Sequence, residues 1–149
     1  MKEVQRGKVL AVNISDNKGT RKTNVHSCAV LRNFGLKDDA HGGPWHRQVS
    51  LLANESIEKM RAMGLNVGYG DFAENITTEG VDLVHLPIGT VIHIGKSVVL
   101  EVTQIGKVCH ERCAIYYQAG DCVMPKEGIF AKVITEGQIK VGDEIVIGG

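Results

Sequence analysis

The stretch LPIGTVIHIGKSVVLEVTQI, residues 86–105, decides the fold class of this chain. It contains two short runs rich in β-branched residues, Thr90–Ile94 and Val98–Ile105, with a glycine between them. β-Branched side chains favour extended strands, and glycine favours the turns between strands. Similar short apolar runs occur at Gly7–Asn13, Ser27–Leu31, Gln48–Leu52, Ile129–Ile134 and Glu144–Ile147. Many short strands with glycine-rich turns predict a mostly β fold, a barrel or a sandwich.

Part of this stretch is echoed near the end of the sequence. Leu86–Gly95 reads LPIGTVIHIG, and Ile139–Gly148 reads IKVGDEIVIG. In both, a glycine precedes a polar residue, isoleucines alternate at matching positions, and a second glycine follows. Alternation buries one face of a strand, so both segments predict a turn followed by a strand. The echo is either reuse of a common unit or pseudo-symmetry within one barrel.

One or two short helices accompany the strands, so the fold is α+β by content. The first is expected at Asn54–Met63, with Asn54 as N-cap, Glu55 near its positive end and Gly64 at its C-cap. The three-to-four spacing predicts one apolar face for this helix, formed by Ile57, Met60 and Met63. A shorter second helix is expected at His110–Gln118.

Length and composition predict one globular domain spanning residues 1–149, without a linker. A chain of this length buries enough surface to fold without a disulfide, a metal or a covalently attached cofactor. The 17 basic and 17 acidic residues balance, so we expect neither nucleic acid nor a membrane surface as a partner. The first residues lack the apolar stretch of a signal peptide, which makes the cytoplasm the expected location.

Cys109 is the first candidate for a reactive residue. It follows the predicted strand Val98–Ile105 and is surrounded by Lys107, His110 and Arg112. Positive neighbours or a helix N-terminus stabilise a thiolate, which is the form of cysteine that accepts or donates sulfur. Lys107 or Arg112 would favour the thiolate, and His110 could shuttle a proton. The sequence therefore predicts a catalytic group formed by Cys109, His110 and Arg112.

Other readings of the cysteines compete with this one. Cys109, His110, Cys113 and Cys122 are soft or borderline ligands suited to zinc or an iron–sulfur cluster, although their spacing differs from common zinc modules. A disulfide between Cys109 and Cys113 is a further alternative. Cys28 lies in an apolar run, and we expect it to be a buried small hydrophobe.

A second cluster of polar side chains lies in GLKDDAHGGPWHRQVSLL, residues 35–52. Functional residues concentrate on loops that a rigid scaffold carries. A histidine here could serve in acid–base chemistry or hold an anion, and Arg47 could bind a phosphate. The alternative is a structural turn whose polar groups cap the backbone and whose Trp45 plugs the barrel end. The candidate side chains are Asp38, Asp39, His41, His46 and Arg47.

A third cluster lies in GYGDFAENITTEG, residues 68–80. Asp71 and Glu74 could act as general acids or bases, and Thr77 and Thr78 could donate to an anion. The same polar residues, with Asn75, could equally hydrogen-bond the loop to itself.

Together these segments resemble the MOSC family, named for the C-terminal domain of molybdenum-cofactor sulfurases. The resemblance rests on four segments in order. They are Gly35, Asp38 or Asp39, His41 and Gly43; Arg47–Leu52; Ala73, Glu74, Asn75, Thr78 and Gly80; and the strands 86–105 that lead to Cys109. Two positions depart from the family pattern. Ala73 stands where glycine is usual, and Val108 stands where proline often precedes the cysteine.

The resemblance implies a β-barrel with a cleft that holds Cys109. It implies a role in sulfur transfer or in handling a molybdopterin-type cofactor, with Cys109 as a persulfide carrier or as the molybdenum or tungsten ligand. The cofactor-binding residues expected from the matched segments are Asp39, His41, Arg47, Glu74, Asn75 and Thr78. Sulfurtransferase-type activity would depend on a separate, pyridoxal-phosphate-dependent cysteine desulfurase as donor, and on a molybdenum enzyme or cofactor-biosynthesis protein as acceptor.

Two alternatives from other functional classes stay open. One is cofactor-dependent reduction of N-hydroxylated compounds, with the bound cofactor as the redox centre. The other is a non-enzymatic binding module that zinc stabilises. Whether the chain is an enzyme in its own right is not decided by the sequence.

Overall fold

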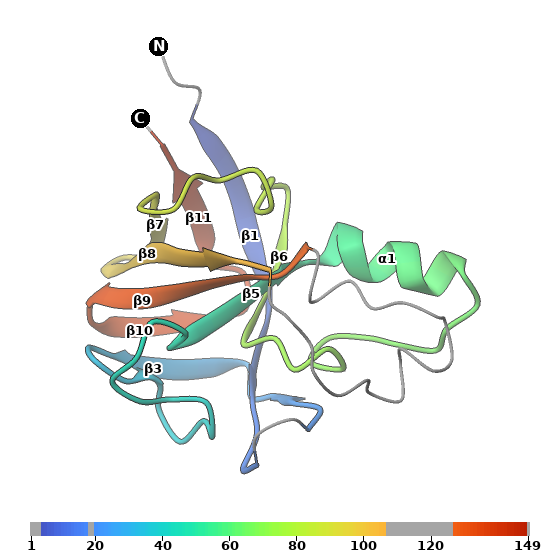
Figure 1. The fold of residues 1–149 in the computed structure, drawn as a ribbon, viewed down its shortest axis with the longest axis horizontal. Helices are drawn as coiled ribbons and strands as arrows, with labels where there is room; N and C mark the ends of the chain where they lie inside the picture. The colour runs from blue at the N-terminus through green and yellow to red at the C-terminus, as the bar shows by residue number, and fades with distance from the viewer. Residues whose placement is uncertain (1–3, 18–19, 107–126, 149) are drawn as a thin grey trace.

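A computed structural model describes residues 4–17, 20–106 and 127–148. Seven strands form a closed β-barrel, which confirms the mostly β prediction (Figure 1). Around the barrel they run β1 (Gln5–Ile14), β11 (Glu144–Ile147), β7 (Val91–Ile94), β8 (Val98–Ile105), β9 (Ile129–Thr135), β5 (Val49–Ala53) and β6 (Ile76–Glu79). β1 closes the ring by pairing with both β11 and β6. Neighbouring strands are antiparallel except β5 and β6, which are parallel.

Four further strands lie outside the barrel ring, and the sequence predicted one of them. β2 (Thr23–Asn24) extends the sheet beside β1, and β10 (Gly137–Lys140), β3 (Ser27–Leu31) and β4 (Gly35–Leu36) form a three-stranded sheet. β3 was predicted, whereas β2, β4, β6 and β10 were missed. β2 and β4 are two residues long, too short for a period to be visible.

The echoed segments are confirmed as strands, and they are neighbours. β7 and β11 pair antiparallel, with Ile94 opposite Ile145 and Ile92 opposite Ile147. All four isoleucines are buried in the barrel core. The glycines before the two strands, Gly89 and Gly142, have nearly the same backbone angle, φ of 94° and 95°, in the left-handed region that glycine favours. The glycine in each of the two turns therefore adopts the same left-handed φ.

Two apolar clusters show that β5 is buried on both faces. Leu51 belongs to the large cluster inside the barrel, whereas Leu52 belongs to a smaller cluster outside it. The helix α1 (Asn54–Ala62) covers this outer cluster with Ile57 and Met60 (Figure 1). Successive residues of a strand point to opposite faces, so one strand supplies both clusters.

The helix confirms the predicted apolar residues Ile57 and Met60, but its ends differ from the prediction. Ala53, not Asn54, occupies the N-cap position, without a side-chain cap hydrogen bond. This happens because β5 runs directly into the helix. Met63 is the C-cap and is exposed, so it does not join the apolar face. Gly64 follows with φ of 93°, and its N–H donates to the carbonyl of Arg61. The helix therefore ends one residue earlier than expected.

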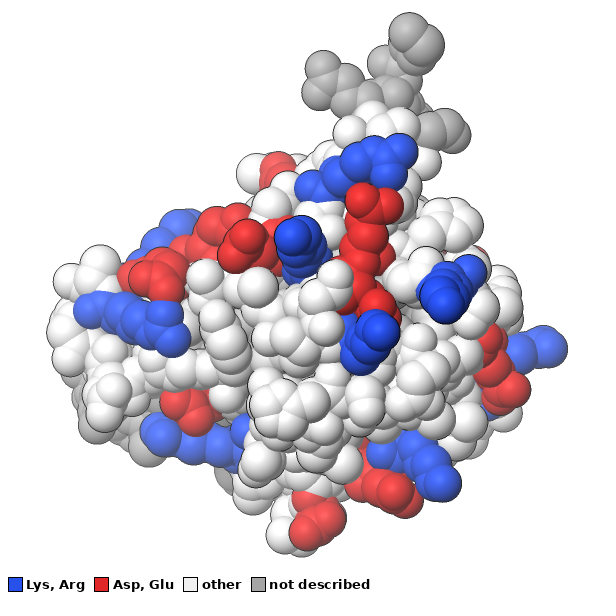
Figure 2. All heavy atoms as spheres, turned by 180° about the vertical axis from the view of Figure 1, so that it is seen from behind, with Lys and Arg blue, Asp and Glu red and all other residues white. Residues whose placement is uncertain are grey.

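Charged side chains of both signs are mixed on the face that Figure 2 shows, without a continuous patch of one sign. Within the part of the chain that the structure describes, no helix has the length and apolar content needed to cross a membrane. The predicted helix His110–Gln118 lies outside the described residues.

Candidate functional site

A buried ion pair lies at the centre of the loops that carry the predicted site residues. Lys22 Nζ is 2.7 Å from Asp39 Oδ1, and both side chains are fully buried. Asp39 Oδ1 also accepts a hydrogen bond from the Ser15 N–H (3.1 Å). Asp39 Oδ2 accepts one from Asn75 Nδ2 (3.0 Å) and one from the His41 N–H (3.3 Å). Every contact made by this carboxylate is with a donor, as expected for an ionised Asp39.

Asn75 joins this ion pair to the barrel. Its side-chain oxygen accepts hydrogen bonds from the Ser50 N–H (2.9 Å) and the Ser50 hydroxyl (3.2 Å) at the start of β5. Its side-chain nitrogen donates to Asp39 and to the carbonyl of Asn13 (3.1 Å) on β1. A single amide thus connects β1, β5 and the loop before β5. These contacts agree better with the alternative in which the polar residues of segment 68–80 form hydrogen bonds within the protein than with an open ligand site.

Glu74 is fully buried beside this amide. One carboxyl oxygen, Oε2, accepts hydrogen bonds from the Thr77 hydroxyl (2.7 Å) and the Gly70 N–H (3.1 Å). The other, Oε1, has no hydrogen-bond partner among the described residues. Burial removes water from the carboxylate and raises the pKa of Glu74, although the hydrogen bond from Thr77 works in the opposite direction.

Thr78 is buried next to this group, and its hydroxyl oxygen also has no partner among the described residues. It alternates with Thr77 along β6 and so shares a face with Ile76, which belongs to the barrel core. Asp39, Glu74, Asn75 and Thr78 are therefore interior residues. Direct contact between these four side chains and a cofactor stays a prediction.

His41, Trp45 and Arg47 form a half-buried group on the loop before β5. The rings of His41 and Trp45 are nearly parallel, with 4° between their planes and 6.3 Å between their centroids. The Trp45 Nε1–H donates to the His41 carbonyl oxygen (2.9 Å). The Arg47 guanidinium lies 4.7 Å from the centroid of the Trp45 ring and 5.2 Å from that of Phe130. Trp45 thus contacts other residues of its own loop and does not belong to the large apolar cluster inside the barrel.

His46 ties the same loop to the end of β8. Its Nε2 is 2.9 Å from Gln104 Oε1, and its carbonyl accepts a hydrogen bond from the Thr103 hydroxyl. The chain then passes Gly106, whose N–H donates to the carbonyl of Gly128 (2.7 Å). The loop that carries His41 and Arg47 is therefore anchored to the strand that leads toward Cys109 in the sequence.

The predicted catalytic residues Cys109, His110 and Arg112, and with them Lys107, Cys113 and Cys122, lie outside the described residues. Cys28 is buried in the barrel core, as predicted. Burial raises the pKa of its thiol, and the nearby carboxylates of Asp38 and Asp39 act in the same direction. Among the described residues, no group of three or more His, Cys, Asp or Glu side chains could hold a metal ion.

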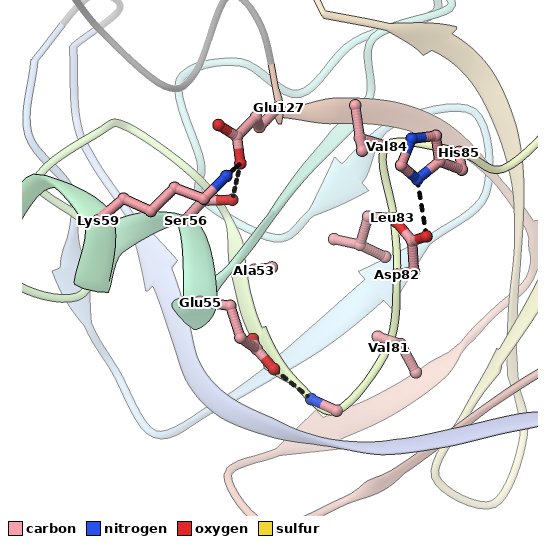
Figure 3. Close-up of a pocket in the computed structure, with 11 residues that line it drawn as sticks. Ala53, Glu55, Ser56, Lys59, Val81, Asp82, Leu83, Val84, His85 and Glu127 are labelled. Atoms are coloured by element: carbon pink, nitrogen blue, oxygen red, sulfur yellow. Dashed lines mark hydrogen bonds and ion pairs between the residues drawn. The ribbon is translucent and has the colours of Figure 1, made fainter.

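A pocket of about 420 Å³ lies at the other ends of β5 and β6, between the start of α1 and segment 80–85 (Figure 3). Several polar side chains that line it contact one another: Glu127 Oε1 accepts hydrogen bonds from the Ser56 hydroxyl (2.7 Å) and from Lys59 Nζ (3.0 Å), and His85 Nδ1 lies 2.7 Å from Asp82 Oδ2. The predicted site residues among the described ones do not line this pocket. The pocket lies at the ends of β5 and β6 opposite to the loops that carry His41, Arg47 and Asn75. Thr78 differs from these residues, because it pairs with Ala53 at the pocket end.

Sequence reasoning missed Lys22, the buried partner of Asp39. It lies in the polar stretch TRKTN, which reads as an exposed turn. Only the position of Asp39, 17 residues further along the chain, explains its burial. Asn13 and Ser50, which complete the network, were also missed, because each looks like an ordinary strand residue.

The closed seven-stranded barrel and its loops can now be compared with known protein families. The family model of the MOSC domain matches residues 37–146, about three quarters of the chain, and the chain belongs to this family. The fold is similar to that of YuaD from Bacillus subtilis, with a TM-score of 0.81 and 18% sequence identity over 99% of this chain and 98% of that one.

YiiM proteins share the fold as well. YiiM from Geobacillus stearothermophilus has a TM-score of 0.69 and 20% identity, covering 96% of this chain and 75% of that one. YiiM from Escherichia coli has a TM-score of 0.67 and 17% identity, covering 97% of this chain and 70% of that one. The search of curated proteins found no match.

Proposed function

We propose that this MOSC domain binds a molybdenum or tungsten pterin cofactor, or carries sulfur destined for it, with the His41–Arg47 loop as its anion-binding element. The observation that carries the proposal is the packing of the Arg47 guanidinium against the Trp45 and Phe130 rings. A guanidinium that stacks through its flat face keeps its in-plane N–H groups available for oxygen ligands. Such a fork suits a phosphate group better than a metal ion.

The described residues fit the anionic part of such a cofactor. Arg47 supplies charge, and His41 lies against the same indole as Arg47. The buried ion pair of Lys22 and Asp39 holds the backbone of this loop in place through the His41 N–H. When bound, the cofactor would supply the metal centre, for which Cys109 is the proposed ligand. The chain's own described residues would bind and orient its phosphate.

In the carrier version, Cys109 takes sulfur from a desulfurase. The Cys109 thiolate attacks the outer sulfur of a persulfide on the donor cysteine. The donor's sulfur–sulfur bond breaks, a new one forms on Cys109, and the donor cysteine leaves as a thiolate. No external oxidant is needed, because the transferred sulfur keeps its oxidation state. The receiving partner would be a molybdenum enzyme or a cofactor-biosynthesis protein.

Cofactor retention tests the binding version. The purified chain is mixed with molybdopterin cofactor, desalted, and analysed for molybdenum and phosphorus. We expect stoichiometric retention by the wild type and at least a tenfold loss of affinity in Arg47→Ala, as removal of a charge-assisted phosphate contact implies. Arg6→Ala is the matched control, because Arg6 forms an exposed ion pair with Glu144 on the barrel wall. Failure of the wild type to retain cofactor would exclude this version.

Intact-protein mass spectrometry tests the carrier version. The chain is incubated with a cysteine desulfurase and free cysteine, and then treated with a reductant. We expect one added sulfur atom that the reductant removes in the wild type and in Cys28→Ala, but no addition in Cys109→Ala. Cys28 is the control because its buried thiol has a raised pKa and is a poor nucleophile. Sulfur addition that survives Cys109→Ala would contradict the assignment.

A further inference from the structure

The exposed residue His46 is held in place by the end of β8. Its carbonyl oxygen accepts a hydrogen bond from the Thr103 hydroxyl, and its ring atom Nε2 lies 2.9 Å from Gln104 Oε1. The ring of Trp45 meets the imidazole edge-on, with 6.0 Å between the two centroids. Contacts of both the backbone and the ring thus fix the orientation of His46 relative to the barrel.

The other end of the Gln104 amide decides where neutral His46 carries its proton. Gln104 Nε2 is 2.7 Å from the carbonyl oxygen of Gly106. A carbonyl oxygen can only accept a hydrogen bond, so the Gln104 atom that faces it is the NH2 group. The atom that faces His46 is then the amide oxygen, which also can only accept. His46 Nε2 must therefore donate, which leaves a lone pair on Nδ1.

Nδ1 of His46 is consequently an acceptor, and it lies beside a group of donors. No described residue donates to this nitrogen. The Arg47 guanidinium packs on the same Trp45 ring that His46 contacts, 4.7 Å from its centroid. A guanidinium has donors only, whereas a fixed lone pair repels a second anionic oxygen and favours an N–H group. The loop therefore offers a ligand one cationic donor and one neutral acceptor.

We propose that His46, held by Gln104 as the Nε2–H tautomer, accepts a hydrogen bond through Nδ1 from a ring N–H or amino group of a heterocyclic ligand whose anionic group Arg47 binds. Gln104 is a positioning residue, because it acts on the ligand only through His46. The class of ligand rests on the function proposed above, since a pterin that carries a phosphate has both kinds of group. The tautomer follows from the contacts of Gln104 and does not depend on that function.

Nitrogen-15 NMR of the histidine side chains in the full chain tests the tautomer without a ligand. At about pH 8, where histidine side chains are ordinarily neutral, we expect His46 to have a protonated Nε2 and an unprotonated Nδ1. His85 is the comparison within the same spectrum, because its Nδ1 lies 2.7 Å from the Asp82 carboxylate and should carry more of the proton. His46→Phe and His85→Phe assign the two signals. A protonated Nδ1 on neutral His46 would overturn the proposal.

Substitutions of Gln104 test its positioning role. In Gln104→Met the acceptor is gone, so we expect a mixture of His46 tautomers and faster exchange of the Nε2 proton with water. Gln104→Glu keeps an acceptor opposite Nε2 and should restore the single tautomer. Gln138→Met, at an exposed position on β10, is the matched control and should leave the His46 signals unchanged. Unchanged His46 signals in Gln104→Met would show that Gln104 does not set the tautomer.

The neutral compound 6-hydroxymethylpterin, which has no phosphate, is the probe for the acceptor role. We expect it to shift the His46 Nδ1 signal in the wild type and to bind several-fold more weakly to His46→Phe. His93→Phe, on the exposed side of β7, is the control and should bind it like the wild type. Equal weakening in both variants, or no shift of Nδ1, would overturn the proposal.

The two proposals can fail separately. If molybdopterin cofactor is retained but the neutral pterin does not shift His46 Nδ1, the proposed function stands and the role assigned to His46 is wrong. If the neutral pterin shifts Nδ1 but the cofactor is not retained, cofactor binding fails as a function, while His46 stands as an acceptor for a heterocyclic N–H group.

Discussion

Asp39 and Asn75, which are 36 residues apart in the sequence, are joined by a buried hydrogen bond of 3.0 Å from Asn75 Nδ2 to Asp39 Oδ2. This bond connects the loop before β5 with the start of β6. Because β5 and β6 are parallel, both loops lie at the same end of the strand pair, and the bond holds them together there. The geometry of the His41–Arg47 loop therefore depends on interior groups.

Asn75→Ala should destabilise the fold by about 3 kcal/mol, because it leaves the Ser50 N–H and the Asn13 carbonyl without their present partners. The free energy of unfolding measured with urea provides the test. Asn66→Ala, at an exposed loop position, is the matched control and should change stability by no more than about 0.5 kcal/mol. Equal effects of the two substitutions would contradict a structural role for Asn75.

Lys22→Met should cost about 3–5 kcal/mol, because it leaves the Asp39 carboxylate buried without its countercharge. Adding Asp39→Asn should recover part of this loss, since the uncompensated charge is then removed. A double-mutant cycle from urea unfolding measures the coupling between the two side chains. If the effects of the two single substitutions on the free energy of unfolding simply add in the double variant, the ion pair does not exist as described.

Glu74 should make stability fall as the pH rises. Its pKa is raised in the folded state by burial, so the folded chain holds a proton that the unfolded chain releases above the ordinary value of 4.5. The contribution of Glu74 is therefore complete below that value, and it is lost as the pH rises through the folded-state pKa, at up to about 1.4 kcal/mol per pH unit.

Glu74→Gln resembles the protonated side chain and should not show this loss. Urea unfolding of the wild type and of Glu74→Gln between about pH 5 and 9 would reveal a difference that grows in favour of the variant. A difference that is independent of pH would mean that Glu74 is not held protonated.

Ala73→Gly should stabilise the fold by about 1 kcal/mol. Ala73 has φ of 62°, in the left-handed region where an alanine is strained and a glycine is not. Thermal or urea unfolding measures the gain. Ala62→Gly, in helix α1, is a control of opposite sign and should cost up to about 1 kcal/mol. Destabilisation by both substitutions would show that Ala73 is not strained.

The departure of Ala73 from the family pattern was visible in the sequence, and the structure supplies its physical meaning. The matched segments also predicted Asp39, Glu74 and Asn75 as cofactor-binding residues, and the structure joins Asn75 to Asp39 through a hydrogen bond. They did not reveal that these residues are interior. Polar residues in a glycine-containing segment look solvent-exposed unless the partners that satisfy them are known.

β6 was missed because its burial, like that of Asp39, depends on partners that are distant in the sequence. Its residues Ile76–Glu79 read ITTE, without the apolar alternation that revealed β7 and β8. Thr77 and Thr78 are both buried, one beside Glu74 and one facing the same side as Ile76. Strand pairing with β1 and β5, which are distant in sequence, makes this segment a strand.

The sequence by itself determined the β class, most strands and the order of the matched segments, because these follow from local periodicity and residue type. Tertiary structure alone decided the closure of the barrel, the N-cap of α1, and the burial of Lys22 against Asp39. A charged side chain can be buried only where a partner offsets its desolvation, and that partner came from a distant part of the chain. Which polar residues are interior is therefore a property of the assembled loops.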